Sequence, residues 1–301
     1  MALYGLQSLR DSPEVRGLLT ALTPKVEGCT ETLRAQAVGN SLYGLRVLGD
    51  SSEVRGLLAA LTPKLRSCSE KLSAHVLGMA LYGLQSLGDS REVRGLVVPL
   101  TTKVQGCTEE LTAAAVGMAL YGLRSLRDSP EVRNLLVELT PKVQGCTQEF
   151  KAQAVGMALY GLQSLRDSPE VRGLLTALTP KVEGCTETLR AQAVGNSLYG
   201  LRVLGDSSEV RGLLAALTPK LRSCSEKLSA HVLGMALYGL QSLGDSREVR
   251  GLVVPLTTKV QGCTEELTAA AVGMALYGLR SLRDSPEVRN LLVELTPKVQ
   301  G

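Results

Sequence analysis

Apolar residues recur at helical spacing in two stretches of this chain, and this pair of stretches returns along its whole length. In the first stretch they fall at positions 15, 18, 19, 22 and 26, with mostly polar or small residues between them. Residues spaced three and four apart lie on one face of an α-helix. The pattern therefore predicts an amphipathic helix from Pro13 to about Val26. We call it the proline helix, because every copy contains at least one proline.

The second stretch predicts another helix, from about residue 31 to residue 48. Apolar positions 35, 38, 42 and 45 form one stripe along it. Thr30 is the expected N-cap. Gly49 is expected to end the helix, because glycine tolerates the left-handed conformation that follows many helices. We call this the tyrosine helix, since each copy carries a tyrosine at the position of Tyr43.

The proline helix has clear signals at its ends. Ser12 is an expected N-cap, and Pro13 suits the first helical position because its missing N–H is harmless there. Pro24 is expected to kink or end the helix, because proline disrupts the bond to the carbonyl four residues back. Asp11 and Arg16 occur in every copy that contains this segment, and we expect them to bridge repeats.

A single repeating unit accounts for the whole chain. The blocks are 1–39, 40–78, 79–117, 118–156, 157–195, 196–234, 235–273 and a partial block 274–301. The four blocks of 1–156 form a cassette, and residues 1–145 recur unchanged as 157–301. A fixed 39-residue period is typical of a solenoid. We therefore predict an all-α fold, an α-solenoid of about seven or eight stacked helix–turn–helix repeats forming a single array over residues 1–301.

Two glycines lie inside each complete tyrosine helix, at the positions of Gly39 and Gly44. Each costs about 1 kcal/mol of helix propensity relative to alanine. We expect this cost to be offset by a close approach of neighbouring backbones, which a methyl group would prevent.

Composition limits the function classes. The chain has 33 Lys and Arg against 29 Asp and Glu, a net charge of +4, which is weak support for nucleic-acid binding. No apolar run approaches the roughly 18 residues of a membrane span, and no leader pattern is present. We expect an intracellular protein in a reducing compartment, the cytoplasm or an organelle matrix, with no membrane partner.

The cysteines recur once per block, always at the same position of the unit: Cys29, Cys68, Cys107, Cys146, Cys185, Cys224 and Cys263. Stacked helices lie about 8–10 Å apart, whereas a disulfide requires Cα atoms within about 7 Å. We therefore expect free, partly buried thiols. No block offers close cysteines or a cysteine and histidine at ligand spacing, so we expect no zinc, no other metal and no cofactor.

The segment AVGNSLYGLRVLGD, from Ala37 to Asp50, resembles the octotricopeptide repeat, whose helix-pair module carries the core LANTLWALAKLG. Tyr43 stands in this chain where that core has tryptophan, and most copies carry methionine in place of Asn40. The resemblance extends over every block. It implies sequence-selective binding of single-stranded RNA in organelles or bacteria.

The side of the tyrosine helix opposite its apolar stripe supplies the candidate contacts. Polar residues there vary among blocks while the framework stays constant, which is how a reader of one base per repeat would look, and also how neutral drift would look. The candidates for RNA binding are Gln36, Asn40, Tyr43, Arg46, His75, Met79, Tyr82, Gln85, Tyr121, Arg124, Gln153, Tyr160, Gln192, Asn196, Tyr199, Arg202, His231 and Tyr238. The candidates for phosphate binding are Lys25, Lys64, Lys103 and Lys142. The tyrosines either stack on bases or wedge between repeats.

No nucleophile motif, phosphate-cradling loop or paired carboxylate outside the repeat framework is present, so we expect no enzyme activity. The leading interpretation is a binding scaffold for single-stranded RNA. The alternatives are a protein-interaction solenoid of the HEAT or armadillo kind that holds an extended peptide or protein, and a concatenated or designed scaffold without a native ligand. The array shows no atypical polar repeat at either end, which predicts end-to-end self-association.

Overall fold

The computed structural model describes residues 2–6 and 8–300, and these contain fifteen α-helices, four short 3-10 segments and no strand. The proline helices are α1 (Pro13–Glu27), α3 (Ser52–Ser67), α5 (Arg91–Gly106), α7 (Pro130–Gln144), α9 (Pro169–Glu183), α11 (Ser208–Ser223), α13 (Arg247–Gly262) and α15 (Pro286–Gln300). The tyrosine helices are α2 (Ala35–Gly44), α4 (Ala74–Tyr82), α6 (Ala113–Tyr121), α8 (Ala152–Tyr160), α10 (Ala191–Gly200), α12 (Ala230–Tyr238) and α14 (Ala269–Gly278). The 3-10 segments are η1 (Leu3–Leu6), η2 (Gly83–Ser86), η3 (Gly122–Ser125) and η4 (Leu279–Ser281). The predicted all-α fold of helix pairs is confirmed.

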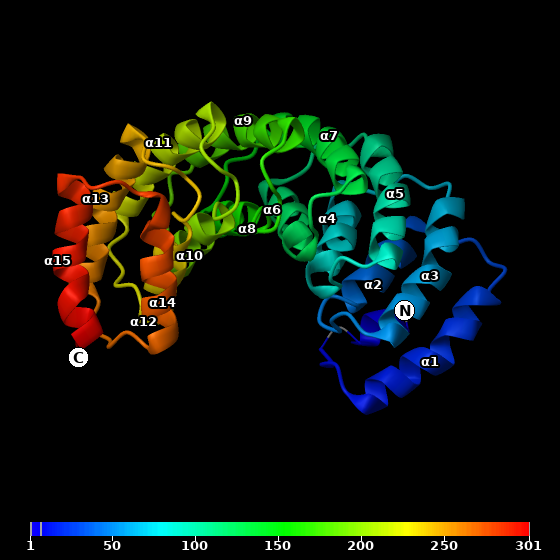
Figure 1. Cartoon of the computed structure of the whole chain (residues 1–301). Helices are drawn as coiled ribbons and strands as arrows, with labels where there is room; N and C mark the ends of the chain where they lie inside the picture. The colour runs from blue at the N-terminus through cyan, green and yellow to red at the C-terminus, as the bar shows by residue number, and fades with distance from the viewer. Residues whose placement is uncertain (1, 7, 301) are drawn as a thin grey trace. The chain divides into compact units, whose positions relative to one another are not determined.

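The chain forms two compact units, Met1–Gln148 and Glu149–Gly301. Each unit has two layers, because within it each helix packs on the equivalent helix of the next repeat (Figure 1). In the first unit α1, α3, α5 and α7 form one layer, and η1, α2, α4 and α6 form the other. In the second unit α9, α11, α13 and α15 form one layer, and α8, α10, α12 and α14 form the other. Apolar side chains such as Leu57, Leu84 and Leu96 are fully buried between and within the layers.

Several local predictions are confirmed. The Ser12 hydroxyl accepts a hydrogen bond from the Val15 N–H, and Pro13 occupies the first turn of α1. Gly49 has a φ of 71°, in the left-handed region that favours glycine. Its counterparts Gly88, Gly205 and Gly244 have the same conformation. The blocks with arginine in this place, such as Arg127, end the tyrosine helix without it, since no described residue other than these glycines has a positive φ.

Pro24 was predicted to kink or end the proline helix, and it does not end it. Helix α1 continues through Pro24 to Glu27, and α3 continues through Pro63 to Ser67. Pro24 and Pro63 lie near the ends of their helices, so each removes one backbone hydrogen bond there. Pro99 lies two turns before the end of α5, and that helix also continues past its proline.

The tyrosine helix is shorter than predicted. Helix α2 begins at Ala35 and not near residue 31, so Thr30 is not its N-cap. The residue in the N-cap position is Arg34, whose side chain makes no capping bond. At its other end the helix changes to a turn or a 3-10 segment, as in η2, before the left-handed glycine. A cap for α2 therefore has to come from elsewhere in the structure.

The missing cap comes from the next repeat. The Glu70 carboxylate, 35 residues further along the chain, accepts a hydrogen bond of 2.6 Å from the Ala35 N–H at the start of α2. The same bond recurs with the acceptor always one repeat ahead, between Ala74 and Glu109, Ala113 and Gln148, Ala152 and Glu187, Ala191 and Glu226, and Ala230 and Glu265. A carboxylate at a helix N-terminus also complements the helix dipole. Helices α2, α8 and α10 have no side-chain cap of their own and depend on the next repeat for this bond. Helices α4, α6 and α12 also have local N-caps, which are Ser73, Thr112 and Ser229.

The expected close approach at the tyrosine-helix glycines is confirmed. A Cβ atom added to Gly44 would lie 1.9 Å from the Leu3 carbonyl oxygen, and one added to Gly83 would lie 2.3 Å from the Leu42 carbonyl oxygen. At Gly39 the added atom would lie 2.7 Å from a methyl carbon of Val76. Backbone atoms of adjacent repeats therefore pass too close for any side chain at the position of Gly44.

Candidate binding surface on the tyrosine helices

The tyrosines of each unit stack on one another. In the first unit, Tyr4, Tyr43, Tyr82 and Tyr121 form a series whose adjacent ring centroids are 5.6 to 6.0 Å apart, with interplanar angles of 21° to 26°. In the second unit, Tyr160, Tyr199, Tyr238 and Tyr277 repeat this arrangement at 5.6 to 5.8 Å. Since the rings between the ends of a series already face other rings, a base has no room to enter between them. The tyrosines hold neighbouring repeats together and present their edges to the surface.

An arginine covers every second tyrosine. The guanidinium carbon of Arg46 lies 4.1 Å from the centroid of the Tyr43 ring. The other arginines three residues after a tyrosine adopt the same pose: Arg124 on Tyr121 at 4.7 Å, Arg202 on Tyr199 at 4.2 Å and Arg280 on Tyr277 at 4.3 Å. A cation over an aromatic face is held by attraction to the ring quadrupole. These arginines are therefore fixed in position on the tyrosine-helix layer.

The exposed polar positions lie at the start of the tyrosine helices. Gln36, His75, Gln153, Gln192 and His231 are all exposed. Gln36 donates a hydrogen bond of 3.0 Å to the side-chain oxygen of Asn40, and Gln192 does the same to Asn196 at 2.9 Å. This part of the candidate surface is accessible and its amides are pre-oriented.

Two candidates lie beneath the surface. Met79 is 7% exposed, and Gln85 is 7% exposed. Met79 occupies the position in its repeat that Asn40 occupies in the preceding one, and Asn40 is half-buried. The structure therefore does not bring Met79 or Gln85 to a position where an incoming ligand could touch them, whereas Tyr43 and Arg46 are half-buried and keep an accessible edge.

The lysines expected to meet phosphate bind backbone carbonyls instead. The Lys103 ammonium group donates to the carbonyls of Cys68 and, at 3.0 Å, Glu70, just beyond the end of α3 in the preceding repeat. Lys64 donates to the carbonyls of Glu27, at 3.1 Å, and Cys29, and Lys142 donates to that of Cys107. Lys25, in the first repeat, is exposed. A phosphate would have to compete with these bonds between repeats. The lysines therefore have a structural role, and phosphate binding by them stays a prediction.

A three-residue segment links each repeat to both of its neighbours. We call it the Cys–Glu loop and define it as residues 68–70 and the equivalent residues of the other repeats. In it the Cys68 thiol lies 3.9 Å from the Glu70 carbonyl, which also accepts from Lys103 of the following repeat. The Glu70 carboxylate caps α2 of the preceding repeat. The cysteine is buried and free, as its spacing predicted.

The expectation that Asp11 and Arg16 bridge repeats is met in part, through Arg16. Hydrogen bonds at the start of α3 lower the pKa of Glu53 in the next repeat, and the charge of Arg16 lowers it further. Arg16 binds Asp11 of its own repeat through two hydrogen bonds, of 2.9 and 2.5 Å. The same pair recurs between Arg211 and Asp206, and the bond from Arg211 holds the pKa of Asp206 below its ordinary value. The pairs fix the turn that precedes each proline helix, and they lie away from the tyrosine-helix surface.

Among residues 2–6 and 8–300, no group of three or more His, Cys, Asp or Glu side chains is placed to hold a metal ion. In the same part of the chain, no helix combines the length and the apolar character needed to cross a membrane.

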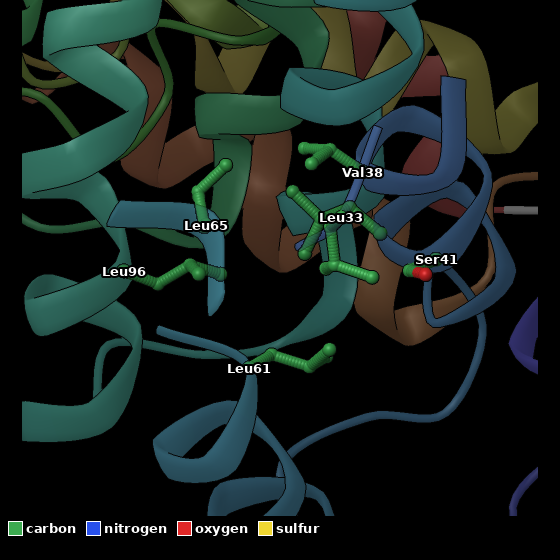
Figure 2. Close-up of a pocket in the computed structure, with 7 residues that line it drawn as sticks. Leu33, Val38, Ser41, Leu61, Leu65 and Leu96 are labelled. Carbon is green, nitrogen blue, oxygen red and sulfur yellow. The ribbon is translucent and has the colours of Figure 1, made fainter. Parts of the chain in front are cut away.

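A small cavity lies between the layers, against Ser41. Figure 2 shows Ser41 facing a space lined by leucine and valine side chains, among them Leu61 and Leu96. The cavity measures about 10 Å³, room for roughly one water molecule and nothing larger. An equivalent cavity lies against Ser197. Ser197 is 1% exposed, and its hydroxyl has no hydrogen-bond partner. These cavities are packing defects and not ligand sites.

Replacing Ser197 with alanine is therefore expected to stabilise the protein by about 1 kcal/mol, because burying a hydroxyl without a partner costs about 1–3 kcal/mol. Other repeats already carry alanine here, and Ala80 and Ala236 are fully buried. Thermal unfolding followed by circular dichroism measures the change. The matched control is Ser223→Ala, since Ser223 is exposed and bonded to the Lys220 carbonyl. A lower melting temperature for Ser197→Ala than for the unaltered chain would contradict this interpretation.

The sequence did not reveal that lysines such as Lys103 and glutamates such as Glu70 bond to the backbone of the preceding repeat. For the tyrosines it offered packing between repeats as one of two alternatives, and their stacking agrees with that alternative. These contacts join residues that lie about one repeat apart, and helix signals describe only neighbours within a turn or two. The one available signal was the regular return of a glutamate two residues after each cysteine in most blocks, without a local partner.

No family model matches the chain, and no curated protein matches it. Among solved structures, the chain is similar to a designed armadillo repeat protein, with 14% identity over 94% of this chain and 99% of the other, at a TM-score of 0.37. Computationally designed armadillo repeat proteins for modular peptide recognition match with 14% identity, 94% and 99% coverage and a TM-score of 0.33. A designed armadillo repeat protein in complex with the peptide (KR)4 matches with 15% identity, 94% and 98% coverage and a TM-score of 0.30. These scores are too low to identify a family, and the octotricopeptide resemblance stays a prediction.

Proposed function

We propose that the chain is a non-enzymatic binding scaffold whose tyrosine-helix layer holds single-stranded RNA. The observation that supports this most is the charge of that layer. The tyrosine helices contain no Asp or Glu, as in α4 and α8, whereas the proline helices carry both signs. The carboxylates that lie at the N-termini of the tyrosine helices, such as Glu70, are bonded to helix amides, where the helix dipole offsets part of their charge. Arginines held on tyrosine rings add positive charge along the same layer. An extended polyanion is attracted to such a surface although the whole chain is close to neutral.

The arrangement suits a single strand better than a duplex. The tyrosine edges, the amides of Gln36 and Asn40, and the imidazole of His75 offer hydrogen-bonding and apolar contacts of the kind that unpaired bases accept. These groups recur along the layer with the repeat, so an extended ligand can touch the same chemistry many times. A duplex would shield its base edges from them.

The test is a titration of the chain into a fluorescently labelled pool of short random single-stranded RNA at low and at moderate salt. We expect binding at low salt that weakens as salt rises, because phosphate contacts release counterions. Absence of binding at low salt would overturn the proposal. If an extended acidic peptide bound as well as the RNA, the layer would be a protein-interaction surface instead.

A variant with added negative charge locates the site. Replacing the five exposed residues Gln36, His75, Gln153, Gln192 and His231 with glutamate is expected to weaken RNA binding at least tenfold, because it places like charge against phosphate. The control places five glutamates at exposed positions of the proline helices: Ala59→Glu, Val98→Glu, Val137→Glu, Thr176→Glu and Ala215→Glu. Equal losses in both variants would contradict binding on the tyrosine-helix layer.

A further inference from the structure

Arginine and glutamine alternate at one position of the tyrosine-helix layer. The residue three places after the tyrosine is Arg46, then Gln85, Arg124, Gln163, Arg202, Gln241 and Arg280. This alternation has a period of two repeats, half that of the cassette. Residues of both kinds are polar, so the sequence alone does not show whether they act alike.

The structure shows that the arginines and the glutamines act differently. From Arg124 onward, each arginine donates a hydrogen bond to the glutamine of the preceding repeat. The Arg124 Nε donates a hydrogen bond of 2.9 Å to the Gln85 carbonyl, and the Arg280 Nε donates one of 3.0 Å to the Gln241 carbonyl. Arg202 reaches the Gln163 side chain instead, with Nη1 2.9 Å from Oε1.

The glutamines are also buried. Gln85, Gln163 and Gln241 are 7%, 9% and 6% exposed, while Arg124 and Arg202 are half-buried and Arg280 is exposed. Two successive repeats therefore form one module, which presents a single guanidinium and no accessible glutamine.

The pose of the guanidinium decides what it can bind. One face lies on the tyrosine ring, so that face is closed to a base. In Arg202 the hydrogen bonds use only Nη1, which goes to Gln163 and to the Tyr199 carbonyl at 3.4 Å. The edge of Arg202 that includes Nη2 can pair with a phosphate, one of the groups that match the guanidinium fork. In Arg280, Nε donates to the Gln241 backbone carbonyl and Nη1 to the Tyr277 hydroxyl, so a phosphate would be bound there through Nη2 alone.

We infer that the RNA backbone is held in steps of two repeats, with one phosphate bound by each arginine and none by the glutamine repeats. This inference rests on the proposed function and makes it narrower. Arg46, Arg124, Arg202 and Arg280 then account for four phosphate contacts.

The number of contacts can be read from the salt dependence of binding. For a single strand the slope of log affinity against log salt is about −0.7 for each phosphate neutralised. Four contacts predict a slope of about −2.8, and a threefold rise in salt then weakens binding about 20-fold. Each Arg→Gln substitution is expected to make the slope shallower by about 0.7, because the chain itself carries glutamine at this position in alternate repeats.

The matched control replaces Gln85 and Gln241 with methionine, which has nearly the same shape, because the arginines bond to the backbone carbonyls of these two residues and not to their side chains. We expect the slope to be unchanged and the affinity to stay within about twofold. Circular dichroism of every variant verifies that the helices are intact. An unchanged slope in the variant lacking all four arginines, with RNA still bound, would overturn the inference and leave the proposed function standing. The inference is also overturned if the methionine variant loses slope as the arginine variant does. Failure of the unaltered chain to bind RNA at low salt would overturn the proposed function itself.

Discussion

Replacing Gly122 with alanine is expected to lower the stability of the array by about 3 kcal/mol or more. An added Cβ would lie 1.9 Å from the Leu81 carbonyl oxygen and 2.6 Å from its carbon, and both belong to the backbone of the preceding repeat. Backbone atoms inside a packed helix pair cannot move aside as a flexible side chain can, so the cost should reach or exceed the usual 1–3 kcal/mol of overpacking. Urea unfolding followed by circular dichroism measures the loss.

The chain supplies a matched control for this substitution. Gly95 lies within α5, and an added Cβ there would meet nothing within 4 Å. Because alanine favours the helix over glycine by about 1 kcal/mol, Gly95→Ala is expected to raise stability or leave it unchanged. Similar losses in the two variants would mean that helix propensity and not the close approach decides the outcome. The close approach would then not be the reason for the glycine at position 122.

The second large effect concerns the lysines that bond to backbone carbonyls of the preceding repeat, such as Lys64, Lys103 and Lys142. Replacing Lys103 with methionine is expected to destabilise the protein by about 2 kcal/mol, because hydrogen bonds to a charged group contribute about 1.5–3 kcal/mol. The substitution removes the bonds to the carbonyls of Cys68 and Glu70, and it removes a positive charge from the C-terminal end of α3. Methionine keeps most of the apolar stem, so the lost energy reports on the ammonium group. The measurement is again the urea midpoint.

Lys25 is the control for this second substitution. It occupies the equivalent position in α1 and is exposed. Lys25→Met is expected to change stability by no more than about 0.5 kcal/mol, the usual range for an exposed site away from special features. If Lys25→Met lowered stability as much as Lys103→Met, the lysines would stabilise the protein through their positive charge alone and not through bonds to the carbonyls.

Local signals in the sequence predicted most of the fold. The helical spacing indicated both helices of the pair, and the N-cap at Ser12 and the left-handed Gly49 are where the residue types indicated. These features depend on atoms within a few residues of one another. Because the unit repeats regularly, a prediction for one helix pair applies to the helix pairs of all the repeats. The close packing at Gly44 was also predictable, since a glycine inside a helix has a cost that something must offset.

Contacts between repeats were beyond such signals. The start of α2 was placed too early, near residue 31, because its cap is Glu70 of the next repeat and not Thr30 nearby. Pro24 was expected to kink or end α1, and the helix continues past it to Glu27.

The candidate surface was predictable in outline but not in detail. Its position opposite the apolar stripe followed from the angle between successive residues, and Gln36 and His75 are indeed exposed. Gln85 is buried, and its backbone carbonyl accepts a hydrogen bond from Arg124, which lies one repeat further along the chain. Which polar residues a ligand can reach is therefore settled by pairs of repeats and not by one repeat alone.

The borrowed caps of the tyrosine helices limit how such a chain can grow or shrink in evolution. Excising one complete unit, such as residues 40–78, rejoins each helix start with an equivalent carboxylate or amide, because the donor and acceptor are always one unit apart. Excising a length that is not a whole number of units leaves a helix amide on one side of the junction and a carboxylate on the other side without their partners. Duplications and deletions of whole units should therefore be tolerated best. The identical segments 1–145 and 157–301 agree with this, because they are offset by four such units.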